Sequence, residues 1–312
     1  MTTGDPATAI LGSALAAVDD ELQHVVGDSP ATLSEYVRDV IEAARPPLFG
    51  GVTATVADAL GDGEAFERAL PAAVALEAVR LQGAVHTGRL AVPPNVDSVD
   101  TQAVLAGDAL YAGAVETVLS VEVTCSRRQR ALEAVLAAVR ETTEGRSRRS
   151  ESQRRDHVSA STYLSIIRST TGAVGATAGR LGALVAGAED GLVADAAAYG
   201  RALGVALGVH DDVCAVLDDP SPLVRSYREM PVQTLATIHA REAGAPVDRL
   251  QLFDHDTDRL VATLRRSGSL AHTDRELRDR ASTALSALES FPAVSGTARL
   301  RTLADVPVDR VG

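Results

Sequence analysis

The stretch that decides the fold is YGRALGVALGVHDDVCAVLDDP, residues 199–220 of a 312-residue chain. Small and apolar residues recur in it at three- and four-residue steps, the spacing of a helix that packs against neighbours. Two adjacent acids, Asp211 and Asp212, interrupt the apolar run. Because a buried carboxylate is costly unless a cation pairs with it, the segment predicts a buried helix that carries a polar site.

The same helical spacing recurs along the rest of the chain, and strand patterns are nearly absent. Proline and glycine turns separate the segments. We expect one all-α domain over residues 1–312, with an irregular tail from about residue 292. Besides a short helix after Gly50-Gly51, the expected helices span about 7–26, 29–45, 64–90, 99–120, 126–143, 159–187, 192–217, 231–243, 246–267 and 274–290.

Composition narrows the class of protein. The chain has 42 acidic and 30 basic residues, a formal charge of -12, which argues against nucleic-acid binding. All the basic residues are arginine, which fits either salt adaptation or the codon usage of a GC-rich genome. Two cysteines make neither a disulfide framework nor a metal motif. With no signal-like start and no long uncharged apolar run, we expect a cytoplasmic protein without a transmembrane segment.

Two further features leave alternatives open. Glycines recur at three- to five-residue steps on the helices expected near residues 172–208, which fits close helix packing or room for a ligand. The segment GRSRRSESQRRDH, residues 145–157, is polar and rich in arginine. We interpret it as a loop that either binds a phosphate-bearing ligand or an acidic partner, or is simply solvated.

Three segments, in order, resemble one known family. They are VLAGDALYAGAVETVL (residues 104–119), STYLSIIRSTTGAVGATAGRLGALVAG (161–187) and the opening stretch. Together they resemble the trans-isoprenyl diphosphate synthases, the polyprenyl synthetase family. The resemblance implies an all-α isoprenoid-synthase bundle around a central cavity. It also implies two facing aspartate-rich motifs that hold Mg²⁺ on a diphosphate substrate.

The chain departs from the family in both of these motifs. The first, D-D-x-x-D after a histidine, aligns with residues 86–91: His86 remains, and Thr87, Gly88 and Ala91 replace the acids. The second keeps Asp211 and Asp212 and has lost its third acid. The resemblance therefore leaves Asp211 and Asp212 as the candidate Mg²⁺ ligands.

Several of the residues with which the family binds diphosphate are also replaced in this chain. Glu42 replaces a lysine, Thr170 replaces the lysine of a lysine-threonine pair, and Arg149 reverses the charge of an acid in a G-Q-x-x-D element. The resemblance leaves four candidate diphosphate ligands: Arg45, Arg80 in the place of a histidine, Thr171, and Arg228 near a lost lysine.

Because a set of metal-binding acids is missing, we interpret the chain as a catalytically impaired family member that acts as a partner or regulatory subunit of a complete synthase. One alternative is an active Mg²⁺-dependent prenyltransferase making linear isoprenyl diphosphates; another is an isoprenoid-binding protein without catalysis. Expected partners are isoprenyl diphosphates and a second chain, in a homodimer or in a heterodimer with a complete synthase. The resemblance places that contact on the helix at 104–119, where small residues such as Gly107 and Gly113 would permit close approach.

Overall fold

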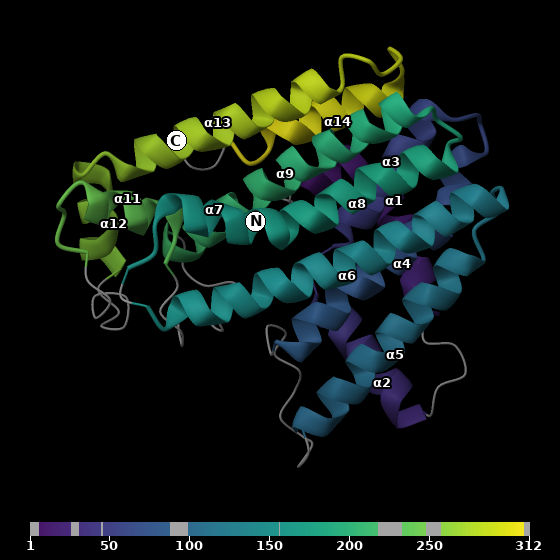
Figure 1. Ribbon diagram of the computed structural model, residues 1–312, viewed down its shortest axis with the longest axis horizontal. Helices are drawn as coiled ribbons and strands as arrows, with labels where there is room; N and C mark the ends of the chain where they lie inside the picture. Colours follow the sequence, from purple (N-terminus) through teal and green to yellow (C-terminus); the bar gives the residue numbers. More distant parts are fainter. Residues whose placement is uncertain are drawn as a thin grey trace.

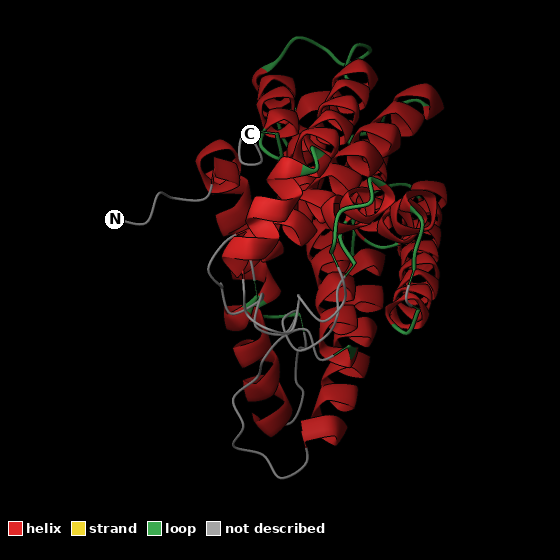
Figure 2. Cartoon of the chain, turned by 90° about the vertical axis from the view of Figure 1, so that its left-hand side faces the viewer, coloured by secondary structure: helices red, strands yellow, loops and turns green. Residues whose placement is uncertain are grey.

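The computed structural model describes residues 6–25, 31–44, 46–87, 99–155, 157–217, 233–247 and 257–308. Within these ranges all regular structure is helical, which confirms the all-α prediction (Figure 2). The helices are α1 (Pro6–Leu22), α2 (Ala31–Ala43), α3 (Leu48–Leu60), α4 (Ala65–His86), α5 (Val99–Leu119), α6 (Cys125–Gln153), α7 (Ala160–Ser169), α8 (Thr171–Val185), α9 (Asp190–Leu217), α11 (Leu235–Glu242), α12 (Thr257–Arg266), α13 (Ser269–Ala287) and α14 (Ser295–Asp305).

Helices α8 and α9 form the centre of the bundle, and glycines let their backbones touch. A Cβ atom on Gly200 would lie 1.9 Å from the carbonyl oxygen of Gly175, and one on Gly175 would lie 2.1 Å from that of Gly200. Only glycine fits at such a crossing. Of the two explanations for the recurring glycines, the structure therefore supports close packing here. Figure 1 shows α6, α8, α9 and α13 side by side around this centre.

Apolar side chains divide into a large cluster and a smaller one. The large cluster joins helices α1 to α6, α8, the N-terminal half of α9, and the segment from α13 to α14. The smaller one lies between α7, the C-terminal part of α9, α11, α12 and α13. Helix α9 is long and apolar enough to cross a membrane, but 67% of its most apolar window is buried in the bundle. A core helix has the same length and composition, so burial accounts for this feature.

Two expectations about irregular segments are wrong. The arginine-rich stretch expected as a loop from residue 145 continues α6 to Gln153. Gly145 lets this helix approach α7, since a Cβ there would lie 2.9 Å from the carbonyl oxygen of Ser169. The tail contains α14, which is held because the Tyr199 hydroxyl donates to the carbonyl oxygen of Leu300 at 2.8 Å. Tertiary contacts thus order both segments despite their polar sequences.

Candidate functional site

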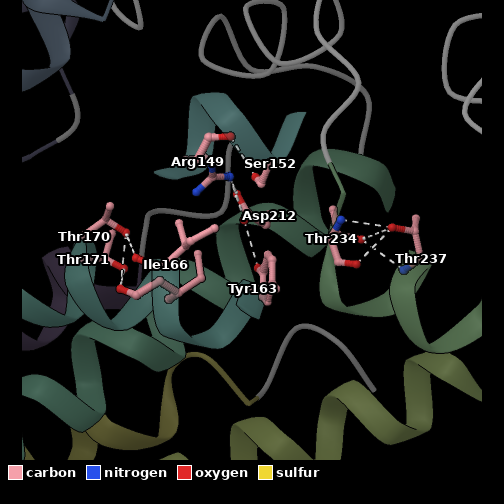
Figure 3. A network of polar contacts seen from close by, with 10 residues as sticks. Arg149, Ser152, Tyr163, Ile166, Thr170, Thr171, Asp212, Thr234 and Thr237 are labelled. Carbon is pink, nitrogen blue, oxygen red and sulfur yellow. Dashed lines mark hydrogen bonds and ion pairs between the residues drawn. The ribbon is translucent and has the colours of Figure 1, made fainter. Parts of the chain in front are cut away.

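Three helices meet at the carboxylate of Asp212 (Figure 3). The side chain lies near the C-terminal end of α9 and is 3% exposed. Nη2 of Arg149, from α6, donates to both carboxylate oxygens, at 2.7 Å and 2.8 Å. The Tyr163 hydroxyl, from α7, donates to Oδ2 at 2.8 Å. The acid is thus bound by an internal cation and a buried phenol.

This arrangement confirms that the buried acid has a cationic partner, but the sequence analysis did not identify the partner. The Arg149 side chain is 13% exposed, so both charges are largely removed from water. Such a pair remains favourable only with good geometry and additional hydrogen bonds, which Tyr163 supplies. The arginine at position 149, where the family has an acid, could have indicated this partner. Because residues 145–157 were expected to form a loop, nothing placed Arg149 beside Asp212.

The neighbouring acid, Asp211, also lies beside a basic group. Its side chain is 41% exposed, and Oδ1 lies 3.6 Å from Nδ1 of His210. Burial alone would lower the pKa of His210, but hydrogen bonds with Asp211 and Cys214 outweigh it and raise this pKa to about 9. His210 is therefore a cation at neutral pH, and its charge partly balances that of Asp211.

One face of α6 also reaches the helix that precedes the altered first motif. The Arg146 guanidinium lies directly over Gly83 of α4, where an added Cβ would be 1.6 Å from Nη1. Arg146 and Arg149 are three residues apart, so they share a face of α6. At the C-terminal end of α4, the hydroxyl of the capping residue Thr87 donates to the carbonyl oxygen of Gly83 at 2.8 Å. Gly88 and Ala91 lie outside the described residues.

Two of the four candidate diphosphate ligands are described, and both have partners within the chain. Arg80 forms an ion pair with Glu77, a fully buried acid whose Oε1 accepts from the backbone NH of Gly50 at 2.8 Å. The Thr171 hydroxyl donates to the carbonyl oxygen of Ile167 at 3.4 Å and lies against Gly208 of α9. Diphosphate binding by these residues stays a prediction.

The other two candidate ligands, Arg45 and Arg228, lie outside the described residues. Thr170, which replaces the lysine, donates to the carbonyl oxygen of Ile166 at 3.0 Å at the break between α7 and α8 (Figure 3). Its hydroxyl is thus used to cap α7, and it brings no positive charge to the site.

The side chains present do not fit a resident Mg²⁺. Within the described ranges, no group of three or more His, Cys, Asp or Glu side chains could hold a metal ion. Asp212 accepts hydrogen bonds from a guanidinium and a phenol, whereas Mg²⁺ requires oxygen ligands arranged octahedrally. The geometry favours an internally neutralised acid over a metal centre.

Comparison with known proteins gives the same family that the sequence resembles. The polyprenyl synthetase profile matches residues 92–252. A geranylgeranyl diphosphate synthase of Methanosarcina mazei is 29% identical over 266 residues, which cover 80% of this chain and 81% of that protein. The predicted family is therefore confirmed.

Solved structures confirm the fold. A polyprenyl synthase from Caulobacter crescentus, complexed with calcium and isoprenyl diphosphate, superposes with a TM-score of 0.84 at 23% identity, covering 99% of this chain and 98% of the other. A geranylgeranyl pyrophosphate synthase from Corynebacterium glutamicum, complexed with the same ligands, has a TM-score of 0.78 at 24% identity over the whole of both chains. Relatives with this fold thus bind a divalent metal together with an isoprenyl diphosphate.

Proposed function

The chain belongs to the polyprenyl synthetase family of isoprenoid biosynthesis, and we propose that it acts there as a catalytically impaired partner or regulatory subunit of a complete synthase. The observation that carries this proposal is the ion pair between Arg149 and Asp212. Family chemistry, as the resemblance implies, needs metal ions to neutralise the leaving diphosphate. Removing that electrostatic stabilisation removes the main catalytic contribution.

The position of the first motif supports the same conclusion. Thr87 stands where the family has its first acid, and its hydroxyl donates to the carbonyl oxygen of Gly83 in the preceding helix. A hydroxyl carries no charge to balance Mg²⁺, and hard carboxylate oxygens are the usual protein ligands of this ion. The first motif therefore lacks the acids on which turnover would depend, and of the two acids kept in the second motif, Asp212 is paired with Arg149.

Exposed apolar residues on one side of α5 support the role of a partner. We define the α5 outer face as the exposed residues Val104, Leu105, Asp108, Ala112, Glu116 and Leu119. Val104 is 52% exposed, and Leu105 and Leu119 are each 47% exposed. They follow one side of a helix that lies at the edge of the bundle in Figure 1. Apolar residues gathered on one exposed face are typical of protein contact sites.

Gly107 and Gly113 do not lie on this surface, which corrects the expectation that they would permit close approach of a second chain. A Cβ on Gly107 would lie 2.0 Å from the His86 imidazole, and one on Gly113 would lie 2.1 Å from the carbonyl oxygen of Val25. Both glycines therefore pack inside this chain. The contact with a second chain is proposed for the opposite side of the helix.

The proposal is tested by assaying the purified chain with Mg²⁺, labelled homoallylic diphosphate and allylic primers of several lengths. We expect no product from the chain alone, and a changed rate or product length when it is mixed with a complete synthase. The matched control is Leu105→Asp, which alters the α5 outer face. Product formed by the chain alone would instead show an active prenyltransferase, and tight diphosphate binding without any effect on the synthase would show an isoprenoid-binding protein.

A further inference from the structure

We propose that the guanidinium of Arg149 is the resident cation of the aspartate site and takes the place of the divalent metal ion there. Asp212 then binds no Mg²⁺ in this chain. The inference deepens the proposed function and rests on it for its consequence, the loss of turnover. Its own test needs neither turnover nor a partner.

The hydrogen bonds to Asp212 leave little room for a metal ion. An ionised carboxylate offers about four lone-pair positions. Arg149 takes one on each oxygen, and Tyr163 takes a second on Oδ2. A Mg²⁺ ion binds at about 2.0–2.1 Å from its ligand oxygens, so on this carboxylate it would lie within a few ångströms of the guanidinium. Repulsion between these cations in a poorly solvated site opposes that geometry strongly.

Arg149 is also fixed in place by its neighbours on α6. The Ser152 hydroxyl donates to the carbonyl oxygen of Arg149 at 2.7 Å. Nη2 of Arg148 donates to Oγ of Ser165 on α7 at 3.1 Å. One turn earlier, Arg146 lies over Gly83 of α4. This part of α6 is therefore tied to α4 and α7, and Arg149 meets α9 in a prearranged position.

The charge at position 149 is opposite to that of the family's acid. Where the resemblance places an acid in a G-Q-x-x-D element, this chain has an arginine whose guanidinium contacts Asp212. An acid at this point would add a ligand for Mg²⁺, whereas the arginine supplies the neutralising charge itself. A single substitution, Arg149→Asp, is therefore expected to convert the site from internally neutralised to metal-binding.

The experiment compares wild type, Arg149→Asp, Arg149→Gln and a control, Arg140→Gln, which changes an exposed arginine on the same helix. Affinity for inorganic diphosphate is measured by calorimetry with and without Mg²⁺, because Mg²⁺ normally completes its shell with phosphate oxygens. We expect Mg²⁺ to leave the affinity of wild type and control unchanged. In Arg149→Asp, Mg²⁺ should raise it at least tenfold.

A second readout reports on the site itself. The chain has no tryptophan and five tyrosines, and Tyr163 contacts Asp212. Tyrosine-sensitised Tb³⁺ luminescence that Mg²⁺ competes away should appear in Arg149→Asp and, more weakly, in Arg149→Gln. It should disappear when Asp212→Asn is added to either variant. Wild type and Arg140→Gln should show none that depends on Asp212.

Either of two results would overturn the inference. One is wild type binding Mg²⁺ or Tb³⁺ through Asp212 as tightly as Arg149→Asp does. The other is a folded Arg149→Gln variant without any gain in metal affinity, which keeps the test decisive if Arg149→Asp fails to fold. A wild type that binds metal yet changes the rate of a synthase would refute this inference alone. A metal-free wild type with no effect on a synthase would refute only the proposed function.

Discussion

At the scale of single residues, the Arg149–Asp212 pair makes a stability prediction. Asp212→Asn should lower the free energy of unfolding by about 3 kcal/mol, because it leaves a largely buried guanidinium without its counter-charge. Adding Arg149→Met should recover part of this loss, with a coupling energy of at least about 1 kcal/mol. Urea unfolding of the single and double variants measures both. Additive losses would contradict a direct pairing.

His210 makes a prediction about pH. In the folded chain burial acts to lower this pKa, but the hydrogen bonds with Asp211 and Cys214 outweigh burial and raise the pKa from its ordinary 6.5 to about 9. A raised pKa adds stability that is fully present below about pH 6.5 and is lost as the pH rises through about 9. The upper bound is about 3 kcal/mol. Thermal unfolding from pH 6 to 10 should show this decline, and His210→Gln should flatten it.

The sequence predicted that the Asp211-Asp212 pair needs a cation, but not which of the two acids is paired or which residue provides the charge. Asp212 stands in an apolar helix, so its need for a cation follows from the cost of burial. Identifying Arg149 required knowing that residues 145–153 are helical, because only then do Arg146 and Arg149 share one face. That conformation depends on contacts with α7 and α9, which a local pattern does not contain.

At the scale of the elements, the point where α8 and α9 cross at Gly175 and Gly200 should tolerate no side chain on either residue. Gly200→Ala would place a Cβ 1.9 Å from a backbone oxygen that cannot move aside. We expect a loss of at least about 2 kcal/mol in unfolding free energy, well beyond a typical surface change. The matched control is Gly191→Ala in the same helix, where an added Cβ meets nothing within 4 Å. Equal stabilities of the two variants would refute the close backbone contact.

Periodicity predicted the apolar helices well and the breaks between them poorly. The helix expected at 99–120 is α5, Val99–Leu119. The residues expected to form one helix at 159–187 form two, α7 and α8, because the backbone of Thr170 leaves the helical region with φ -105° and ψ -97°. Its hydroxyl bonds back to the carbonyl oxygen of Ile166, a local competition with the helix that composition does not reveal.

At the scale of the whole molecule, the two sides of α5 have different roles: the inner side packs in the fold, and the α5 outer face is available for association with a second chain. Helix α5 packs on α4 through His86 and Gly107, and these contacts lie on its inner side. Its outer side exposes Leu105 and Leu119 and adds nothing to the described core. Substitutions there should therefore change association with a second chain without unfolding this one.

The last prediction is that Leu105→Asp with Leu119→Asp abolishes that association. A stable interface buries more than about 1,000 Å² in total, and a carboxylate in place of each exposed leucine would be desolvated there without a partner. Light scattering of the chain alone, and of its mixture with a complete synthase, measures assembly, and circular dichroism checks that the variant is folded. The control is Val294→Asp, since Val294 is 44% exposed between α13 and α14, away from α5. Wild type that is monomeric both alone and in the mixture, or a double variant that assembles like wild type, would show that α5 is not the contact surface.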